Sequence, residues 1–137
     1  MQTLRGMVEK LGLDDMITFK GIITKEELYL IYSTSDVFLL LSEYEGHSMA
    51  LSEAMAFGLV PIVTRVGGNP HMVDDETGYV VDYPAKIEEV GAILKQLVYD
   101  EKLLSQKSEQ ARNYAVKHFD LETRVRQFIE IYESVTR

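Results

Sequence analysis

Residues 42–58 read Ser-Glu-Tyr-Glu-Gly-His-Ser-Met-Ala-Leu-Ser-Glu-Ala-Met-Ala-Phe-Gly, and the rest of the chain can be placed around them. They follow directly on five apolar residues, Val-Phe-Leu-Leu-Leu at 37–41, a run typical of a strand buried on both faces of a parallel sheet. Gly46 allows the chain to turn, and Ser48 is a good N-cap for a helix that Gly58 would end. The stretch therefore predicts a strand, a glycine turn and a helix.

The predicted turn has the properties of an anion site. A helix start leaves unpaired backbone N–H groups, and the helix dipole favours negative charge there, so a phosphate or diphosphate could dock. Glu45 and Glu53 flank this point, and since carboxylates repel phosphate we expect them to accept hydrogen bonds from hydroxyl groups on either side. A ligand with hydroxyls flanking a diphosphate is a nucleotide sugar.

The spacing of the two glutamates also has a purely structural interpretation. Two glutamates with seven residues between them are common by chance in an acidic protein. Ser42 and Glu45 have the spacing of a capping box, although Gly46 makes a helix start there less attractive. On spacing alone the structural interpretation is favoured.

The wider motif favours a functional interpretation. Its members are Glu45-Gly46, then Glu53-Ala54-Met55-Ala56, Gly58, Pro61 and Gly67-Gly68. Together they closely resemble the donor-binding motif of the retaining GT-B glycosyltransferases of the group 1 or family 4 type. The chain has His47 and Ser48 where that family usually has Phe-Gly, and Leu41 where a Pro often precedes the Ser. The resemblance runs from about Leu11 to the C-terminus.

This resemblance implies an α/β fold, with a Rossmann-like parallel sheet flanked by helices on both faces. We expect residues 1–137 to form a single partial domain, the C-terminal nucleotide-sugar-binding domain of a GT-B enzyme, lacking its first strand. The family's second domain opens with a strand, a basic residue and a Gly-x-Gly turn, none of which precedes Met1. Residues 2–11 would be the helix after that turn, stopped by Gly12. The N-terminal acceptor domain would be absent.

The same resemblance implies a function. The chain would bind a nucleotide-diphosphate sugar for retaining glycosyl transfer to a glycan, lipid or other acceptor, in polysaccharide or glycoconjugate biosynthesis. The enzyme would be a hexosyltransferase-like glycosyltransferase and part of a longer protein. Because the family's main cations are missing, we expect weak nucleotide binding and little or no activity from this chain by itself.

The implied site residues fall on both glycine turns and on an earlier loop. Glu45 would be the catalytic residue and would contact the donor sugar, and Glu53 would contact the ribose. The diphosphate would be held by the backbone at Gly46, His47, Ser48 and Met49, beside Gly67 and Gly68. Ile23 would contact the base through its backbone, or would simply be a buried branched residue.

The roles of two further residues stay open at this point. His71 stands where the family usually has a Glu, and it could read the ligand or be a solvated loop residue. Arg65 is a cation near the predicted diphosphate site, but a surface pairing with Asp74 or Asp75 explains it as well.

The remaining elements follow from local patterns. Residues 16–19 are expected to form a short strand, and Thr24 with Glu27 a capping box for the next helix. Residues 60–64 predict a further strand, residues 77–81 a turn followed by the final strand, and Asn69 the cap of a short helix. Three amphipathic packing helices should follow, with apolar residues at helical spacing between residues 87 and 135.

Composition excludes several classes of function. A formal net charge of −8 argues against nucleic acid as a partner, and the absence of cysteine excludes disulfides and thiolate chemistry. The three histidines do not have metal-ligand spacing and Asp-x-Asp does not occur, so we expect no metal and no cofactor. No apolar run approaches a membrane span and no signal peptide is recognisable, so a cytoplasmic protein is expected, peripheral to the membrane only through an absent domain.

Two alternative functions remain. Some nucleotide-sugar epimerases share this architecture, and an epimerised free nucleotide sugar formed without an acceptor would identify one. A non-catalytic α/β interaction module, whose glycines serve only as turns, would bind no nucleotide at all.

Overall fold

The computed structural model describes residues 2–135, with side chains described from Leu4 onward. These residues form two compact units, which divide between Leu30 and Ile31.

The first unit begins with a helix and continues as irregular chain. Helix α1 (Gln2–Lys10) is followed by Gly12 in the left-handed region, at φ +63°, so the predicted helix and its stop are confirmed. The strand predicted at residues 16–19 is wrong. A strand persists only with a neighbour to pair with, and within the first unit this segment has none. The Met16 and Ile17 amides instead donate to the Leu13 carbonyl oxygen, at 3.0 and 3.1 Å.

Helix α2 (Lys25–Ser33) begins in the first unit and ends in the second. Its start is the predicted capping box. The Thr24 amide donates to Glu27 Oε2 at 2.8 Å, and the Glu27 amide donates to Thr24 Oγ1 at 3.2 Å. Tyr32, near its end, is buried in the second unit.

The second unit is built on a parallel sheet in the order β1-β2-β3. The strands are β1 (Val37–Leu40), β2 (Val60–Thr64) and β3 (Tyr79–Val81). Every residue of the central strand β2 is buried, but Leu39 on β1 is 48% exposed. Full burial of the run at 37–41 was therefore a wrong prediction, because among the described residues β1 has a strand neighbour on one side only.

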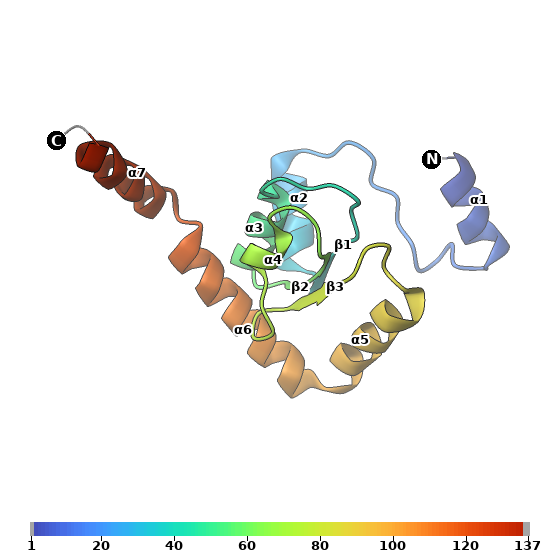
Figure 1. Cartoon of the computed structure of the whole chain (residues 1–137). Helices are drawn as coiled ribbons and strands as arrows, with labels where there is room; N and C mark the ends of the chain where they lie inside the picture. Colours follow the sequence, from blue (N-terminus) through green and yellow to red (C-terminus); the bar gives the residue numbers. More distant parts are fainter. Residues whose placement is uncertain (1, 136–137) are drawn as a thin grey trace. The chain divides into compact units, whose positions relative to one another are not determined.

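Helices cover both faces of this sheet (Figure 1). Side chains alternate between the faces along β2, so Val63 lies in one hydrophobic cluster while Val60 and Ile62 lie in the other. The cluster around Val63 is covered by α3 (Met49–Ala56), by α4 (Asn69–Met72) and by the second half of α6 (Glu101–His118). The opposite cluster is covered by α5 (Ile87–Tyr99) and the first half of α6. Helix α6 therefore contributes to both clusters.

The turn before β3 is tied to α6 by a buried lysine. Lys107 Nζ donates to the carbonyl oxygens of Asp75, at 2.6 Å, and of Gly78, at 3.5 Å. It also lies 4.5 Å from the centre of the Tyr79 ring. Burial lowers the pKa of Lys107, and the nearby carboxylates of Asp75 and Asp74 only partly oppose this.

The chain ends in α7 (Leu121–Val135), the last of the three predicted amphipathic helices. None of its described residues is buried, and Phe128, Ile129 and Tyr132 are 60%, 51% and 69% exposed. The helix is therefore present as predicted, but its apolar stripe is not buried against the rest of the second unit. No helix in residues 2–135 has the length and apolar character needed to span a bilayer.

Candidate functional site

The two glycine turns lie together at the carboxyl edge of the sheet. The first follows β1 and leads into α3, and the second follows β2 and leads into α4. They are joined by hydrogen bonds, from the Gly68 amide to the Gly46 carbonyl oxygen at 2.9 Å and from Thr64 Oγ1 to the Ser42 carbonyl oxygen at 2.6 Å. In open α/β sheets this edge is where ligands bind. The sequence prediction that the two turns are neighbours is confirmed.

Close contact between the turns explains the two glycines of the second turn. Gly67 has φ +51°, and a Cβ atom at this position would overlap the Glu45 carbonyl oxygen. A Cβ atom on Gly68 would lie 2.5 Å from the Gly46 carbonyl oxygen. Both glycines are therefore needed for packing, whether or not they also approach a ligand.

The start of α3 presents free backbone donors. Ser48 is the N-cap, with its Oγ accepting from the Leu51 amide at 3.3 Å, as predicted. The N–H groups of Gly46, His47, Ser48 and Met49 have no acceptor within residues 2–135. Such a group of donors at a helix start favours a bound anion.

Glu45 is held at the turn by a neighbouring hydroxyl. Its side chain is half-buried, and Oε1 accepts a hydrogen bond from Ser42 Oγ at 2.7 Å. No helix begins at Ser42, so the capping-box interpretation of this pair is wrong. The bond leaves the second carboxylate oxygen of Glu45 able to accept a hydrogen bond from a ligand hydroxyl.

Glu53 lines a cleft beside the turn. The cleft has a volume of about 570 Å³ and lies between α3 and the junction of α6 with α7. Its lining residues are His47, Met49, Ser52, Glu53, Ala56, Ala115, Val116, Phe119, Asp120, Leu121 and Arg124. Three predicted site residues, His47, Met49 and Glu53, therefore share one cleft. Sequence reasoning missed the wall opposite them, because nothing local marks residues some seventy positions away as neighbours of the turn.

The His47 ring is fixed by two contacts in this cleft. Its Nε2 lies 3.3 Å from Ser52 Oγ, and its ring meets Phe119 edge to face with centres 5.7 Å apart. Phe119 in turn meets Tyr114 edge to face at 5.6 Å. His47 is thus connected to the end of α6 through an aromatic cluster.

Arg65 has surroundings that differ from the prediction, and those of His71 leave its role open. Arg65 pairs with Asp82, with Nε 3.1 Å from Oδ1, so the alternative interpretation of a pairing with Asp74 or Asp75 is wrong. His71 is exposed on α4, and its carbonyl oxygen accepts from Tyr114 Oη at 3.2 Å.

Asn69 is the first residue of α4 and not its cap, which is Gly68. The Asn69 side chain is fully buried and its Nδ2 donates back to the Thr64 carbonyl oxygen at 3.1 Å, while Oδ1, the atom that would accept a capping bond, is buried without a partner among the described residues.

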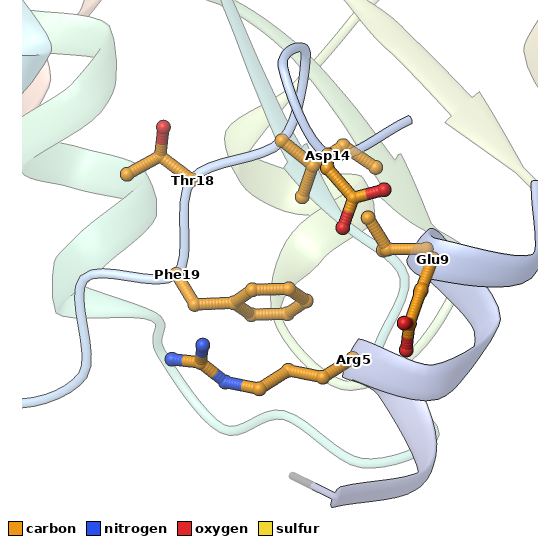
Figure 2. A pocket seen from close by; sticks show the side chains of 7 residues that line it. Arg5, Glu9, Asp14, Thr18 and Phe19 are labelled. Atoms are coloured by element: carbon orange, nitrogen blue, oxygen red, sulfur yellow. The ribbon is translucent and has the colours of Figure 1, made fainter. Parts of the chain in front are cut away.

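Ile23 lies half-buried in the first unit. That unit also contains a hollow of about 480 Å³ between α1 and the chain that follows it. Figure 2 shows the Arg5 side chain extending along the Phe19 ring, with a 5.1 Å separation between the guanidinium carbon and the ring centre, and Glu9 and Asp14 at the other end. None of the predicted site residues lines this hollow. In the part of the chain that the structure describes, no group of acidic or histidine side chains could hold a metal ion.

Comparison with known proteins gives consistent matches. Residues 1–115 match the family model described as glycosyl transferases group 1. N-acetyl-alpha-D-glucosaminyl L-malate synthase of Bacillus anthracis is 35% identical over 136 residues, which cover 98% of this chain and 35% of that protein. The chain spans about a third of the length of the curated relatives it matches.

Solved structures agree with these sequence matches. The C-terminal domain of a glycosyl transferase group 1 family protein (LpcC) from Francisella tularensis is 29% identical with a TM-score of 0.79, covering 88% of this chain and 62% of that one. Alr3699/HepE from Anabaena, solved in complex with UDP, has a TM-score of 0.88 at 21% identity, covering 97% of this chain and 36% of that one.

Proposed function

Because this chain belongs to the glycosyl transferases group 1 family and has the Rossmann-like α/β fold of its GT-B members, we propose that it binds the nucleoside-diphosphate sugar that serves as donor. The observation that carries the proposal is the group of free N–H donors at residues 46–49, at the start of α3 and against the second glycine turn. The UDP bound to Alr3699/HepE, a protein of similar fold, supports a nucleotide as the ligand.

The backbone donors are suited to the diphosphate. Its negative charge would lie where the dipole of α3 is positive and where four amides lack an acceptor in the described chain. The Gly68 amide is occupied by the Gly46 carbonyl oxygen, so the second turn supports the first and offers fewer donors of its own.

The two glutamates would bind the hydroxyl groups on either side. Glu45 keeps a free carboxylate oxygen beside the turn and would contact the donor sugar close to the reacting carbon. Glu53 lies within the cleft and would accept hydrogen bonds from the ribose. Ile23, in the first unit, stays a prediction for the backbone contact to the base.

The proposed reaction is a retaining transfer of the sugar to a glycan, lipid or other acceptor, in a protein longer than this chain. When the sugar–phosphate bond breaks, negative charge grows on the departing diphosphate while positive charge grows on the anomeric carbon. Donors already fixed at the start of α3 would stabilise that negative charge without reorganising. An acceptor site would come from a further domain, so this chain alone is expected to bind nucleotide weakly and to transfer little or no sugar.

Titration of the 137-residue chain with UDP, GDP and ADP, followed by backbone amide NMR shifts, tests the proposal. We expect shifts that cluster at residues 45–53 and at Gly67 and Gly68, and the nucleotide that gives the tightest binding identifies the base. Adding EDTA should leave the affinity unchanged, because the proposed contacts need no metal. The absence of shifts at millimolar concentrations of all three nucleotides would contradict nucleotide binding by this chain.

A pair of matched variants assigns the role of Glu53. Glu53→Gln removes the charge and should weaken nucleotide binding roughly tenfold, because hydrogen bonds to a charged acceptor are the stronger ones. Glu89→Gln makes the same change on α5, which covers the opposite face of the sheet, and should not alter affinity. Equal affinities for the two variants would rule out the ribose contact.

A further inference from the structure

The first glycine turn lies in an acidic protein and has few cations near it. The net charge of the chain is −8. Arg65, the cation beside the second turn, is already paired with Asp82 at 3.1 Å. Among the described residues that line the cleft beside this turn, the basic ones are His47, within the turn, and Arg124, on the far wall.

The contacts of Ser52 determine which His47 nitrogen carries a proton. Ser52 Oγ lies 3.2 Å from the Ser48 carbonyl oxygen, which can only accept, and 3.3 Å from His47 Nε2. The hydroxyl has one hydrogen, so both contacts are hydrogen bonds only if Ser52 donates to Ser48 and accepts from Nε2–H. Nε2 is then the protonated nitrogen of the neutral ring, and Nδ1 is left without a partner within residues 2–135.

Phe119 limits the movement of this ring. The edge-to-face contact at 5.7 Å and the bond to Ser52 hold the imidazole from two sides, while the side chain as a whole stays exposed to solvent. A second proton can therefore reach Nδ1, and it would produce a fixed imidazolium within the turn that carries the free amides.

We propose that His47 is the switchable positive charge of this site, with an imidazolium that binds the diphosphate and with Ser52 and Phe119 as its positioning residues. This rests on the proposed function, since it assigns a side chain to the same diphosphate position. The titratable groups that line the same cleft as His47 are Glu53 on α3 and Asp120 and Arg124 beyond Phe119. Tyr114 lies against Phe119 and His118 against Tyr114 on α6, Glu45 belongs to the same turn as His47, and Arg65 and His71 flank the second turn.

The first test follows the ring protons of the histidines. The chain contains three histidines, so single variants assign their ring signals unambiguously. The probes are UDP-glucose, GDP-mannose and ADP-glucose, because the diphosphate of a nucleotide sugar keeps a constant charge between about pH 6 and pH 8. With the sugar nucleotide that binds, the titration midpoint of His47 should move to higher pH, while those of His71 and His118 stay in place. By linkage, affinity should then be about fivefold higher at pH 6 than at pH 8.

Variants separate a pH dependence caused by the His47 charge from one caused by a change in structure. His47→Gln should remove the pH dependence of affinity, and the matched change His118→Gln should keep it. Arg124→Gln should lower affinity equally at both pH values, because its charge does not change in this range. Phe119→Leu should reduce the pH dependence by releasing the ring.

Three results would overturn the inference. Binding that is detected but has the same pH dependence in His47→Gln as in the wild type, or a His47 midpoint that does not move, refutes the role of the imidazolium and leaves the donor site intact. Failure of all three nucleotide sugars to bind the wild type at either pH refutes both the inference and the proposed function.

Discussion

At Gly67 a single added methyl group is enough to separate the two turns of the site. The motif that contains Gly67 and Gly68 was interpreted from the sequence as part of a ligand site. The structure gives a more direct reason why both positions are glycine, because the backbone of the first turn lies where a Cβ atom would be. The site is thus rigid for the same reason that its glycines are required.

Gly67→Ala should lower the free energy of unfolding by about 2–4 kcal/mol, because it combines a left-handed backbone with an overlap on the Glu45 carbonyl oxygen. Urea unfolding measures the change. Gly91→Ala is the matched control, since Gly91 lies within α5 and an added Cβ meets nothing within 4 Å. It should raise stability by about 0.5–1 kcal/mol. A Gly67→Ala variant as stable as the wild type would show that the turns can separate at no cost.

Whether the other residue-level predictions succeeded depended on how close in sequence the contacting residues are. The Thr24–Glu27 box and the Ser48 cap were predictable, because each involves only residues three positions apart. Arg65 was given the wrong partner, because Asp82 lies 17 residues away and comes near only when β3 pairs with β2. Asn69 was given the wrong role, because the turn after β2 folds its side chain back onto the Thr64 carbonyl oxygen.

At the scale of elements, α3 serves as both core and binding element. One face, with Leu51, Ala54 and Met55, is fully buried, and the free amides of residues 46–49 lie in the turn that leads into its start. The order of that first turn therefore depends on its cap.

Ser48→Ala and Asp100→Ala form a matched pair of cap deletions. Each side chain accepts from the amide three residues on, at 3.3 Å in α3 and 2.9 Å in α6. Each deletion should cost about 1 kcal/mol of stability in urea unfolding. Only Ser48→Ala should also weaken nucleotide binding, measured by calorimetric titration. Equal losses of affinity in both variants would mean that the α3 start has no special role.

Elements were predictable where the pattern is local and strong. Helical periodicity and glycine stops located α1, α3 and the three C-terminal helices, and apolar runs located the strands of the sheet. The strand at 16–19 and the double-sided burial of β1 failed, because strand formation and burial are set by neighbours that a local pattern does not reveal.

At the scale of the molecule, the candidate site was predictable in part. That its two turns are neighbours could be predicted, since adjacent parallel strands end at the same edge of the sheet. The cleft wall formed by Phe119 and Arg124 could not be predicted, because α6 brings those residues close to α3 from a distant part of the chain.

Helix α7 should contribute little to the stability of the second unit. None of its described residues is buried, so removing residues 121–137 should change the melting temperature by no more than about 2 °C. The truncated chain should also remain monomeric to higher concentrations, because exposed Phe128, Ile129 and Tyr132 are lost. Calorimetry and sedimentation measure these changes, and a large fall in melting temperature would show that α7 packs on the unit in solution.

Helix α6 contributes side chains to both hydrophobic clusters. Leu103 and Leu104 pack in the cluster on one side of the sheet, and Ala111 and Ala115 belong to the cluster on the other. Neither cluster can lose its contacts with α6 without uncovering part of the other. The second unit should therefore melt in a single cooperative step, and its two faces should exchange their amide hydrogens with solvent at the same slow rate. A site at the sheet edge between those faces then persists for as long as the whole unit stays folded.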